Sequence, residues 1–152
     1  MEKLRIVFMG TPDFAVGILD AILKNNYEVV GVITAPDKPA GRGQKLNQSA
    51  VKLYALENNL HILQQTNLKS ESFIDELKAL NANLQVVVAF RMLPKIVWDM
   101  PKLGTFNLHA SLLPDYRGAA PINWAIINGE ETTGVSAFKK KKKIDTGAVI
   151  LK

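Results

Sequence analysis

Short apolar runs alternate along the chain with longer segments whose apolar residues recur every three or four positions. The run at residues 4–9 ends at Gly10 and predicts a buried strand. A helix is expected directly after it, with Thr11 as its N-cap and Pro12 in its first position. The Val-rich run at 27–35 predicts a second strand. This β-α-β order predicts a right-handed crossover and a parallel sheet.

The same pattern predicts the remaining elements. Further helices are expected at residues 49–59, 70–80, 94–98 and 121–128. Further strands are expected at residues 61–63, 84–90, 105–109, 132–138 and 148–151. In the helix at 49–59, the positions expected to face the core are Val51, Leu53, Tyr54 and Leu56. The polar segments 35–48 and 139–147 are expected to be loops. The 152 residues therefore predict one α/β domain.

The turn after the first strand argues against a dinucleotide cofactor. A nicotinamide- or flavin-binding fold would carry a Gly-x-Gly-x-x-Gly pattern there, because the glycines let the backbone approach the pyrophosphate. This chain has only Gly10, followed by Thr11 and Pro12.

The cysteine and histidine content and the length of the apolar runs exclude further classes of protein. The chain has no cysteine, which excludes a disulfide framework, a thiolate zinc site and a thiol nucleophile. Its two histidines, at 61 and 109, are far apart, so no metal is expected. No apolar run approaches the roughly 20 residues that span a membrane. We expect a cytoplasmic protein.

The net charge of +5 allows a polyanionic partner such as nucleic acid, but only weakly. Five of the 19 Lys and Arg residues lie in one run, at 139–143, and the rest of the chain is close to neutral. The loop at 35–48 is long for an α/β connection. It holds Arg42 between two glycines, with Lys38 and Lys45 nearby, and is either a functional loop or a solvated one.

The candidate chemistry lies at the end of the strand that finishes at His109. Alternation along a strand puts Thr105, Asn107 and His109 on one face, with Phe106 and Leu108 on the other. Ligands of open α/β sheets bind at the carboxyl ends of the strands. An amide can stabilise an oxyanion and an imidazole can move a proton, which together suit acyl transfer.

Other residues decide what kind of acyl transfer is expected. No Gly-x-Ser-x-Gly elbow is present, so direct attack by the acceptor is favoured over a covalent intermediate. Asp145 is the candidate third member, since a carboxylate can orient an imidazole. From the residues alone, Asn107 and His109 could equally be a structural pair, and Asp145 a turn residue. Arg91, just past the strand at 84–90, is either a cleft residue or an ordinary exposed arginine.

Longer motifs carry a resemblance to a known family. The run at 107–121 fits Asn-x-His-x-Ser-x-Leu-Pro-x-Tyr-Arg-Gly and is followed by Asp145-Thr146-Gly147. This pattern resembles the folate-dependent formyltransferase family. The segments at 8–15 and 39–46 resemble the member of that family that acts on initiator methionyl-tRNA. The similarity extends over essentially the whole chain.

The resemblance implies a fold and an activity. The fold would be a Rossmann-like, doubly wound, mostly parallel sheet, forming a single catalytic domain over residues 1–152. The activity would be transfer of a formyl group from 10-formyltetrahydrofolate to the α-amino group of methionine on initiator tRNA. A monomer that needs no metal and no membrane is expected.

The resemblance also implies residue roles. Asn107 would stabilise the oxyanion, His109 would assist with charge and proton transfer, and Asp145 would organise His109 and a water. Ser111, Leu112, Leu113 and Pro114 would line the folate site. The segment with Phe90, Arg91 and Met92, together with the loop around Asp145, would hold the pterin ring. The loop with Arg42 and Lys45 would reach the acceptor end of the tRNA.

Two features depart from the family. The family's catalytic domain runs on past this chain's end, and its tRNA-specific member adds a C-terminal β-barrel, so the chain is expected to be truncated at the C-terminus. The lysine run at 139–143 is unusual before Asp-Thr-Gly and is a solvated loop, an uncertain stretch of sequence or an anion-attracting segment. Two alternatives stay open: a formyltransferase for a nucleotide sugar or purine precursor, and an inactive folate-binding module.

Overall fold

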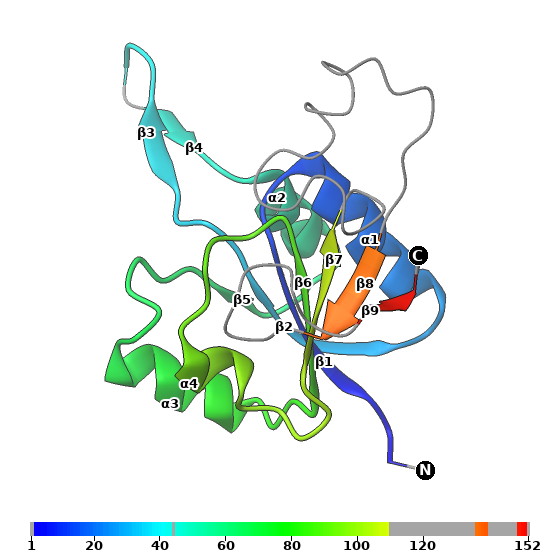
Figure 1. Ribbon diagram of the computed structural model, residues 1–152. Helices are drawn as coiled ribbons and strands as arrows, with labels where there is room; N and C mark the ends of the chain where they lie inside the picture. Colours follow the sequence, from blue (N-terminus) through cyan, green and yellow to red (C-terminus); the bar gives the residue numbers. More distant parts are fainter. Residues whose placement is uncertain (1, 44, 110–135, 140–148, 152) are drawn as a thin grey trace, which may run out of the picture.

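A mixed sheet with helices on both faces forms the body of the protein (Figure 1). The computed structural model describes residues 2–43, 45–109, 136–139 and 149–151. The principal sheet has the strand order β5-β2-β1-β6-β7-β8-β9. Neighbours from β5 to β7 are parallel, whereas β7–β8 and β8–β9 are antiparallel. The predicted α/β architecture with a mostly parallel sheet is confirmed.

The strands of this sheet fall on the apolar runs of the sequence. Their bounds are β1 Arg5–Gly10, β2 Glu28–Ile33, β5 Ile62–Leu63, β6 Leu84–Val88, β7 Thr105–His109, β8 Ser136–Lys139 and β9 Val149–Leu151. Every residue of β6 is buried, as a central parallel strand covered on both faces requires. Lys139, expected to begin a loop, is instead the last residue of β8, because its backbone pairs with Phe106 of β7.

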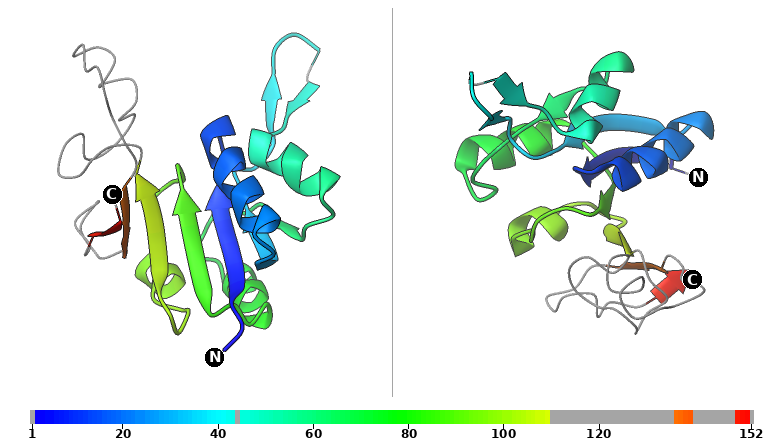
Figure 2. Two further views of the ribbon diagram at one scale, coloured as in Figure 1. Left: turned by 90° about the vertical axis from the view of Figure 1, so that its right-hand side faces the viewer. Right: turned by 90° about the horizontal axis from the view of Figure 1, so that it is seen from above.

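Alternation along the strands divides the core into two layers. One layer contains Val7, Met9, Ile33 and Val87 and packs against α3 (Glu71–Ala79) and α4 (Lys95–Trp98). The other contains Ile6, Phe8, Val32 and Val86 and packs against α1 (Asp13–Lys24) and α2 (Ala50–Glu57). Figure 2 shows the two helix pairs on opposite faces of the sheet, as a doubly wound fold requires.

Two helix predictions need correction. Thr11 is not the N-cap of α1: Pro12 precedes the helix in extended conformation (φ −82°, ψ 175°), and no side chain caps it. In α2, Val51 is buried as predicted, but Leu53 and Leu56 are 48% and 52% exposed. The small Ala55 takes the core position instead, because it lets α2 pack closely.

The segment at 35–48 is not simply a loop. It contains β3 (Lys38–Ala40) and β4 (Lys45–Asn47), which pair antiparallel as a separate two-stranded hairpin. At the tip, Gly41 and Gly43 have φ of +73° and +101°, a region open to glycine but costly for other residues. Arg42 lies between them. Polar composition concealed the hairpin, since its strands bury no apolar face.

The carboxyl ends of the parallel strands form one edge of the sheet. Gly10 of β1 pairs with Val88 of β6, and Val88 pairs with Leu108 of β7, so these residues form one row. The hairpin leaves the sheet beyond the end of β2 and stands above this same edge (Figures 1 and 2). The fold thus gathers the hairpin, the end of β6 and the end of β7 at one side of the molecule.

Candidate active site

Strand β7 places the two central candidates where the sequence predicted them. Phe106 and Leu108 pack toward the α1–α2 layer. Thr105 points to the other face, where its hydroxyl lies 2.7 Å from the backbone carbonyl oxygen of Trp98 in α4. Since side chains alternate along a strand, Asn107 and His109 share the face of Thr105. The predicted division of this strand into two faces is therefore confirmed at Thr105, Phe106 and Leu108.

His109 lies at the carboxyl edge itself. On one side, β7 pairs with β6 as far as Leu108 opposite Val88, so His109 is one residue past the paired row. On the other side, His109 pairs with the buried Ser136 of β8. His109 is 6% exposed, and Asn107, two residues before it on the strand, is half-buried. A sheltered imidazole next to an amide can act on a substrate group that enters from the edge.

Several predicted site residues lie outside the described part of the chain. These are Asp145, Ser111, Leu112, Leu113 and Pro114. Their roles in organising His109 and lining the folate site stay predictions.

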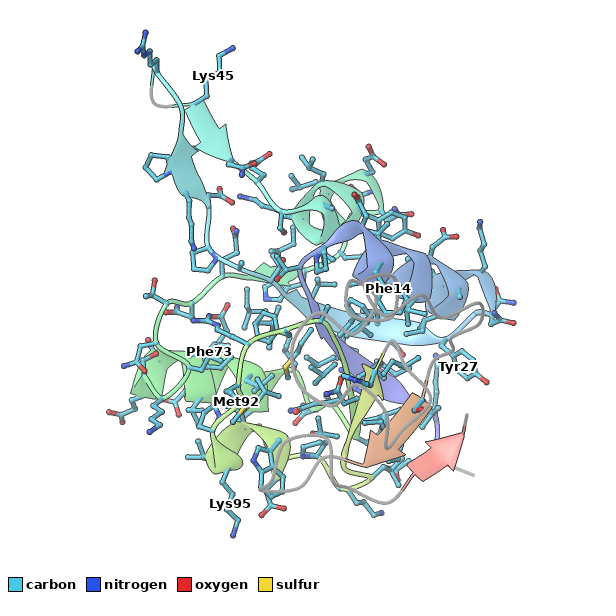
Figure 3. The ribbon with its side chains drawn as sticks, turned by 45° about the horizontal axis from the view of Figure 1, so that its top comes forward. Phe14, Tyr27, Lys45, Phe73, Met92 and Lys95 are labelled. Carbon is cyan, nitrogen blue, oxygen red and sulfur yellow. The ribbon has the colours of Figure 1, made fainter. Side chains whose placement is uncertain are left out.

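The segment after β6 also reaches the edge. Ala89 has φ of +49°, a conformation that side-chain-bearing residues seldom adopt, and this turns the chain away from the strand direction. Phe90 then packs against the α3–α4 layer, and Met92 is 63% exposed. Figure 3 shows the Met92 side chain on the α3–α4 side of the molecule.

This segment borders an open hollow of about 510 Å³. The hollow is lined by Thr66, Asn67, Leu68, Lys69, Arg91, Met92, Leu93 and Pro94. Its volume falls within the range of about 300–1,000 Å³ that is common for small-molecule sites. Two of the predicted folate-binding residues, Arg91 and Met92, therefore line a space that could take part of such a ligand.

Arg91 makes contacts that the sequence did not predict. Its Nη1 donates to the Thr66 carbonyl at 2.6 Å, and its Nη2 donates to the Gln65 carbonyl. Its guanidinium also lies 5.5 Å from the centre of the Phe90 ring. Partial burial lowers the pKa of Arg91 from its ordinary value, yet an arginine stays protonated at neutral pH. Arg91 thus ties the two walls of the hollow together rather than pointing freely into it.

The hairpin brings the predicted nucleic-acid contacts to the same edge. Arg42 and Lys45 are exposed, as is Lys38 at the start of β3. The Lys45 side chain points away from the body of the protein (Figure 3). Strand β2, from which the hairpin leaves, is three strand positions from β7. At about 4.8 Å per strand this is roughly 14 Å, within reach of an extended single-stranded substrate.

Sequence reasoning missed the residues that hold the hairpin to the body. Asp37 accepts hydrogen bonds from Lys52 of α2 and from Gln64 after β5. These partners are 15 and 27 residues from Asp37 along the chain, so no local pattern links them.

Comparison with known sequences establishes the family. The profile of the formyl transferase family matches residues 4–152, and the chain belongs to that family. It is 80% identical over 151 residues to a methionyl-tRNA formyltransferase of Flavobacterium johnsoniae, covering 99% of this chain and 48% of that protein. It is 64% identical over 149 residues to the protein of that name from Bacteroides thetaiotaomicron, covering 98% and 46%. The chain thus spans about half the length of these relatives.

Solved structures show the same fold. A phosphoribosylglycinamide formyltransferase from Bacillus halodurans superposes with a TM-score of 0.74 at 20% identity, over 96% of this chain and 76% of that one. The sugar 3N-formyl transferase WlaRD superposes with a TM-score of 0.61 at 28% identity, over 99% and 51%. The fold is therefore shared by formyltransferases whose names state different acceptors.

Neither a metal-binding cluster nor a membrane-spanning helix is found among the described residues. Among these residues, no group of three or more His, Asp and Glu side chains is placed to hold a metal ion. No helix in the described part of the chain is both long and apolar enough to cross a bilayer.

Proposed function

We propose that this chain carries the catalytic portion of an enzyme that formylates initiator methionyl-tRNA. The formyl donor is 10-formyltetrahydrofolate, and the acceptor is the α-amino group of the methionine. The single observation that carries the proposal is the 80% identity to a methionyl-tRNA formyltransferase over nearly the whole chain. The exposed cationic hairpin at the edge where His109 ends β7 supports the same acceptor.

The proposed chemistry is a direct transfer. The methionine amine attacks the formyl carbon, a new C–N bond forms, and the carbonyl oxygen gains negative charge. The side-chain amide of Asn107 donates a hydrogen bond to that oxyanion. His109 takes a proton from the attacking amine and returns one to the folate nitrogen as its bond to carbon breaks. Asp145 holds His109 in the orientation for both steps.

The proposal assigns substrate sites on either side of this centre. The segment with Phe90, Arg91 and Met92 and the residues at 111–114 hold the folate. Arg42 and Lys45 contact phosphates and bases at the acceptor end of the tRNA. Residues 1–152 belong to one catalytic domain, and the enzyme works as a monomer in the cytoplasm.

The test is a set of acceptor assays on the natural protein that contains this chain. With 10-formyltetrahydrofolate as donor, formylation is measured for methionyl-tRNA, for phosphoribosylglycinamide and for an amino-sugar nucleotide. Transfer to methionyl-tRNA alone is expected. Transfer only to one of the other two would establish a sister formyltransferase, and folate binding without transfer to any acceptor would establish an inactive module.

The first prediction concerns the two described catalytic candidates. Asn107→Ala removes the oxyanion donor and should lower kcat by about 10²–10³. His109→Ala removes the proton carrier and should lower kcat by about 10²–10⁴. Asn58→Ala, at an exposed position past the end of α2, is the control and should keep full activity. If either active-site variant kept wild-type turnover with an unchanged circular dichroism spectrum, its assigned role would be wrong.

A further inference from the structure

The two arms of the hairpin are joined to each other where they meet the sheet. Thr34, fully buried one residue past the end of β2, lies with its Oγ1 2.6 Å from the Oγ of Ser49. Ser49 also caps α2, since its Oγ accepts the backbone N–H of Lys52 at 3.0 Å. One hydrogen bond therefore joins the residue where the chain leaves the sheet to the residue where it returns, and the second of these residues is fixed as the N-cap of α2.

A second set of contacts holds the outgoing arm. The Asp37 carboxylate accepts from Lys52 Nζ at 2.5 Å and from Gln64 Nε2 at 2.8 Å. The same Gln64 nitrogen donates to the Ala35 carbonyl at 2.9 Å. The side chains of Lys52 and Asp37 are only 14% and 18% exposed. We call the side chains of Asp37, Lys52 and Gln64 the hairpin brace.

The carboxylate of Asp37 is held in its ionised form by its two partners in the brace. The Lys52 ammonium, and then the Gln64 amide, hold the pKa of Asp37 below its ordinary value of 3.8. Because the pKa of Asp37 is lower in the folded protein, its ionised form stabilises the fold. This stabilisation is complete when the pH is above the ordinary pKa of 3.8, and it is lost as the pH falls through the lowered pKa. The ion pair is therefore intact throughout the neutral range.

Within the described residues, few contacts beyond the brace hold the direction of the hairpin. All three residues of β4 are exposed, including Leu46 at 64%. Among the residues whose burial is described, none of β3 or β4 belongs to either core layer. A two-stranded hairpin without an apolar face is marginal by itself. Its angle over the edge of the sheet is therefore set at its base.

We propose that Asp37 is a positioning residue for the acceptor substrate, because the hairpin brace fixes the direction in which the hairpin carries Arg42 and Lys45 over the carboxyl edge. This inference rests on the proposed function, in which that substrate is methionyl-tRNA. Without the brace, Arg42 and Lys45 occupy many positions. Binding of the acceptor must then return the hairpin to the single position in which both side chains contact it. The affinity for tRNA falls, while the folate site at the ends of β6 and β7 is untouched.

The experiment compares kinetic constants for both substrates in the natural protein. Asp37→Asn keeps the shape of the side chain but removes its charge, and Lys52→Gln removes the other half of the pair. Each should raise KM for methionyl-tRNA by about 10- to 100-fold and leave kcat and the KM for 10-formyltetrahydrofolate unchanged. A rise in both KM values, or a fall in kcat alone, would overturn the proposal.

A second background separates positioning from a general structural role. In a protein with both Arg42→Ala and Lys45→Ala the brace has little left to position, so adding Asp37→Asn should raise KM for tRNA little further. An undiminished, additive effect would contradict the proposal. Asp20→Asn is the matched control: Asp20 accepts from the Tyr54 hydroxyl of α2 and from Lys24, both at 2.7 Å, yet it belongs to α1. It should leave both KM values unchanged.

A substrate-independent measurement keeps this inference distinct from the proposed function. In Asp37→Asn, amide hydrogen exchange of residues 38–47 should become faster while exchange in β1 and β6 stays as it was. If the wild-type protein formylates another acceptor, the proposed function fails, and faster exchange at 38–47 still supports the brace. Unchanged exchange there, whichever acceptor is used, would overturn the brace.

Discussion

At the scale of single residues, Gly10 shows how tightly the carboxyl edge is built. It is the last residue of β1 and the turning point into α1. A Cβ at this position would lie 2.7 Å from Ala15 Cβ and 2.8 Å from the Val88 carbonyl oxygen. Both are closer than unstrained contacts allow, and neither neighbour is the end of a flexible chain. A side chain here would push α1 or β6 away.

Gly10→Ala should therefore destabilise the protein by about 1–3 kcal/mol, as overpacking of a well-filled interior does. Gly17→Ala is the matched control, since nothing lies within 4 Å of its added Cβ on the exposed side of α1. That change should stabilise by about 0.5–1 kcal/mol, because alanine favours a helix. Urea unfolding of both variants measures the difference. Equal urea midpoints for the two variants would show that the packing around Gly10 has room for a methyl group.

Single residues also show which features of the site the sequence predicts and which it does not. Asn107 and His109 were predicted on one face because a strand alternates strictly. Arg91 was predicted near the cleft, but its partners were not, since Gln65 and Thr66 are about 25 residues away in the chain. Alternation is a local rule, whereas a hydrogen bond from a long side chain to a distant carbonyl depends on the whole fold.

At the scale of elements, Thr105 connects three of them below the candidate catalytic pair. Its Oγ1 lies 2.9 Å from Gln85 Oε1 on β6 and 2.7 Å from the Trp98 carbonyl oxygen of α4. Thr105 and Gln85 are both 1% exposed. Both neighbours are acceptor oxygens, so the single hydroxyl proton of Thr105 is shared between them. This buried chain fixes β7 against its neighbours.

Thr105→Val keeps the shape but removes the hydroxyl, leaving a buried amide and a buried carbonyl without that partner. We expect a loss of about 1–3 kcal/mol in the free energy of unfolding. Thr105→Ser retains the hydroxyl and loses one methyl group, at a cost of about 0.8 kcal/mol. Thermal unfolding of the two variants distinguishes these effects. A serine variant less stable than the valine variant would show that packing, not hydrogen bonding, holds β7 in place.

The hairpin and α2 show why some elements escaped prediction. The segment at 35–48 lacks an alternating apolar face, so its composition indicated a loop, while backbone pairing and the Asp37 contacts make it a hairpin. In α2, the larger Leu53 and Leu56 are exposed and the small Ala55 is buried. Apolar spacing predicts that a helix has a buried face, but close packing against α1 decides which face it is.

At the scale of the whole molecule, the stable core and the proposed substrate contacts are separated in space. Strands β1 and β6 lie at the centre of the parallel part of the sheet and contribute to both core layers. No described residue of the hairpin strands belongs to either layer. The sheet and its helices were predictable because the spacing of apolar residues indicates which segments are buried as strands or helices. The direction of the hairpin was not, since the contacts at its base join side chains that are distant in sequence.

Hydrogen exchange should make this separation measurable. In the free natural protein, exchange should be slowest in β1 and β6 and fastest at residues 38–47, because only the former lie between two packed layers. Adding methionyl-tRNA without the folate donor should slow exchange at 38–47 and leave β1 and β6 unchanged, since in the proposed function the acceptor contacts the hairpin and not the core. Raised salt should reverse the slowing, because cation–phosphate contacts weaken as salt increases. Protection spread evenly over the surface, or confined to regions other than the hairpin, would show that the tRNA is held elsewhere.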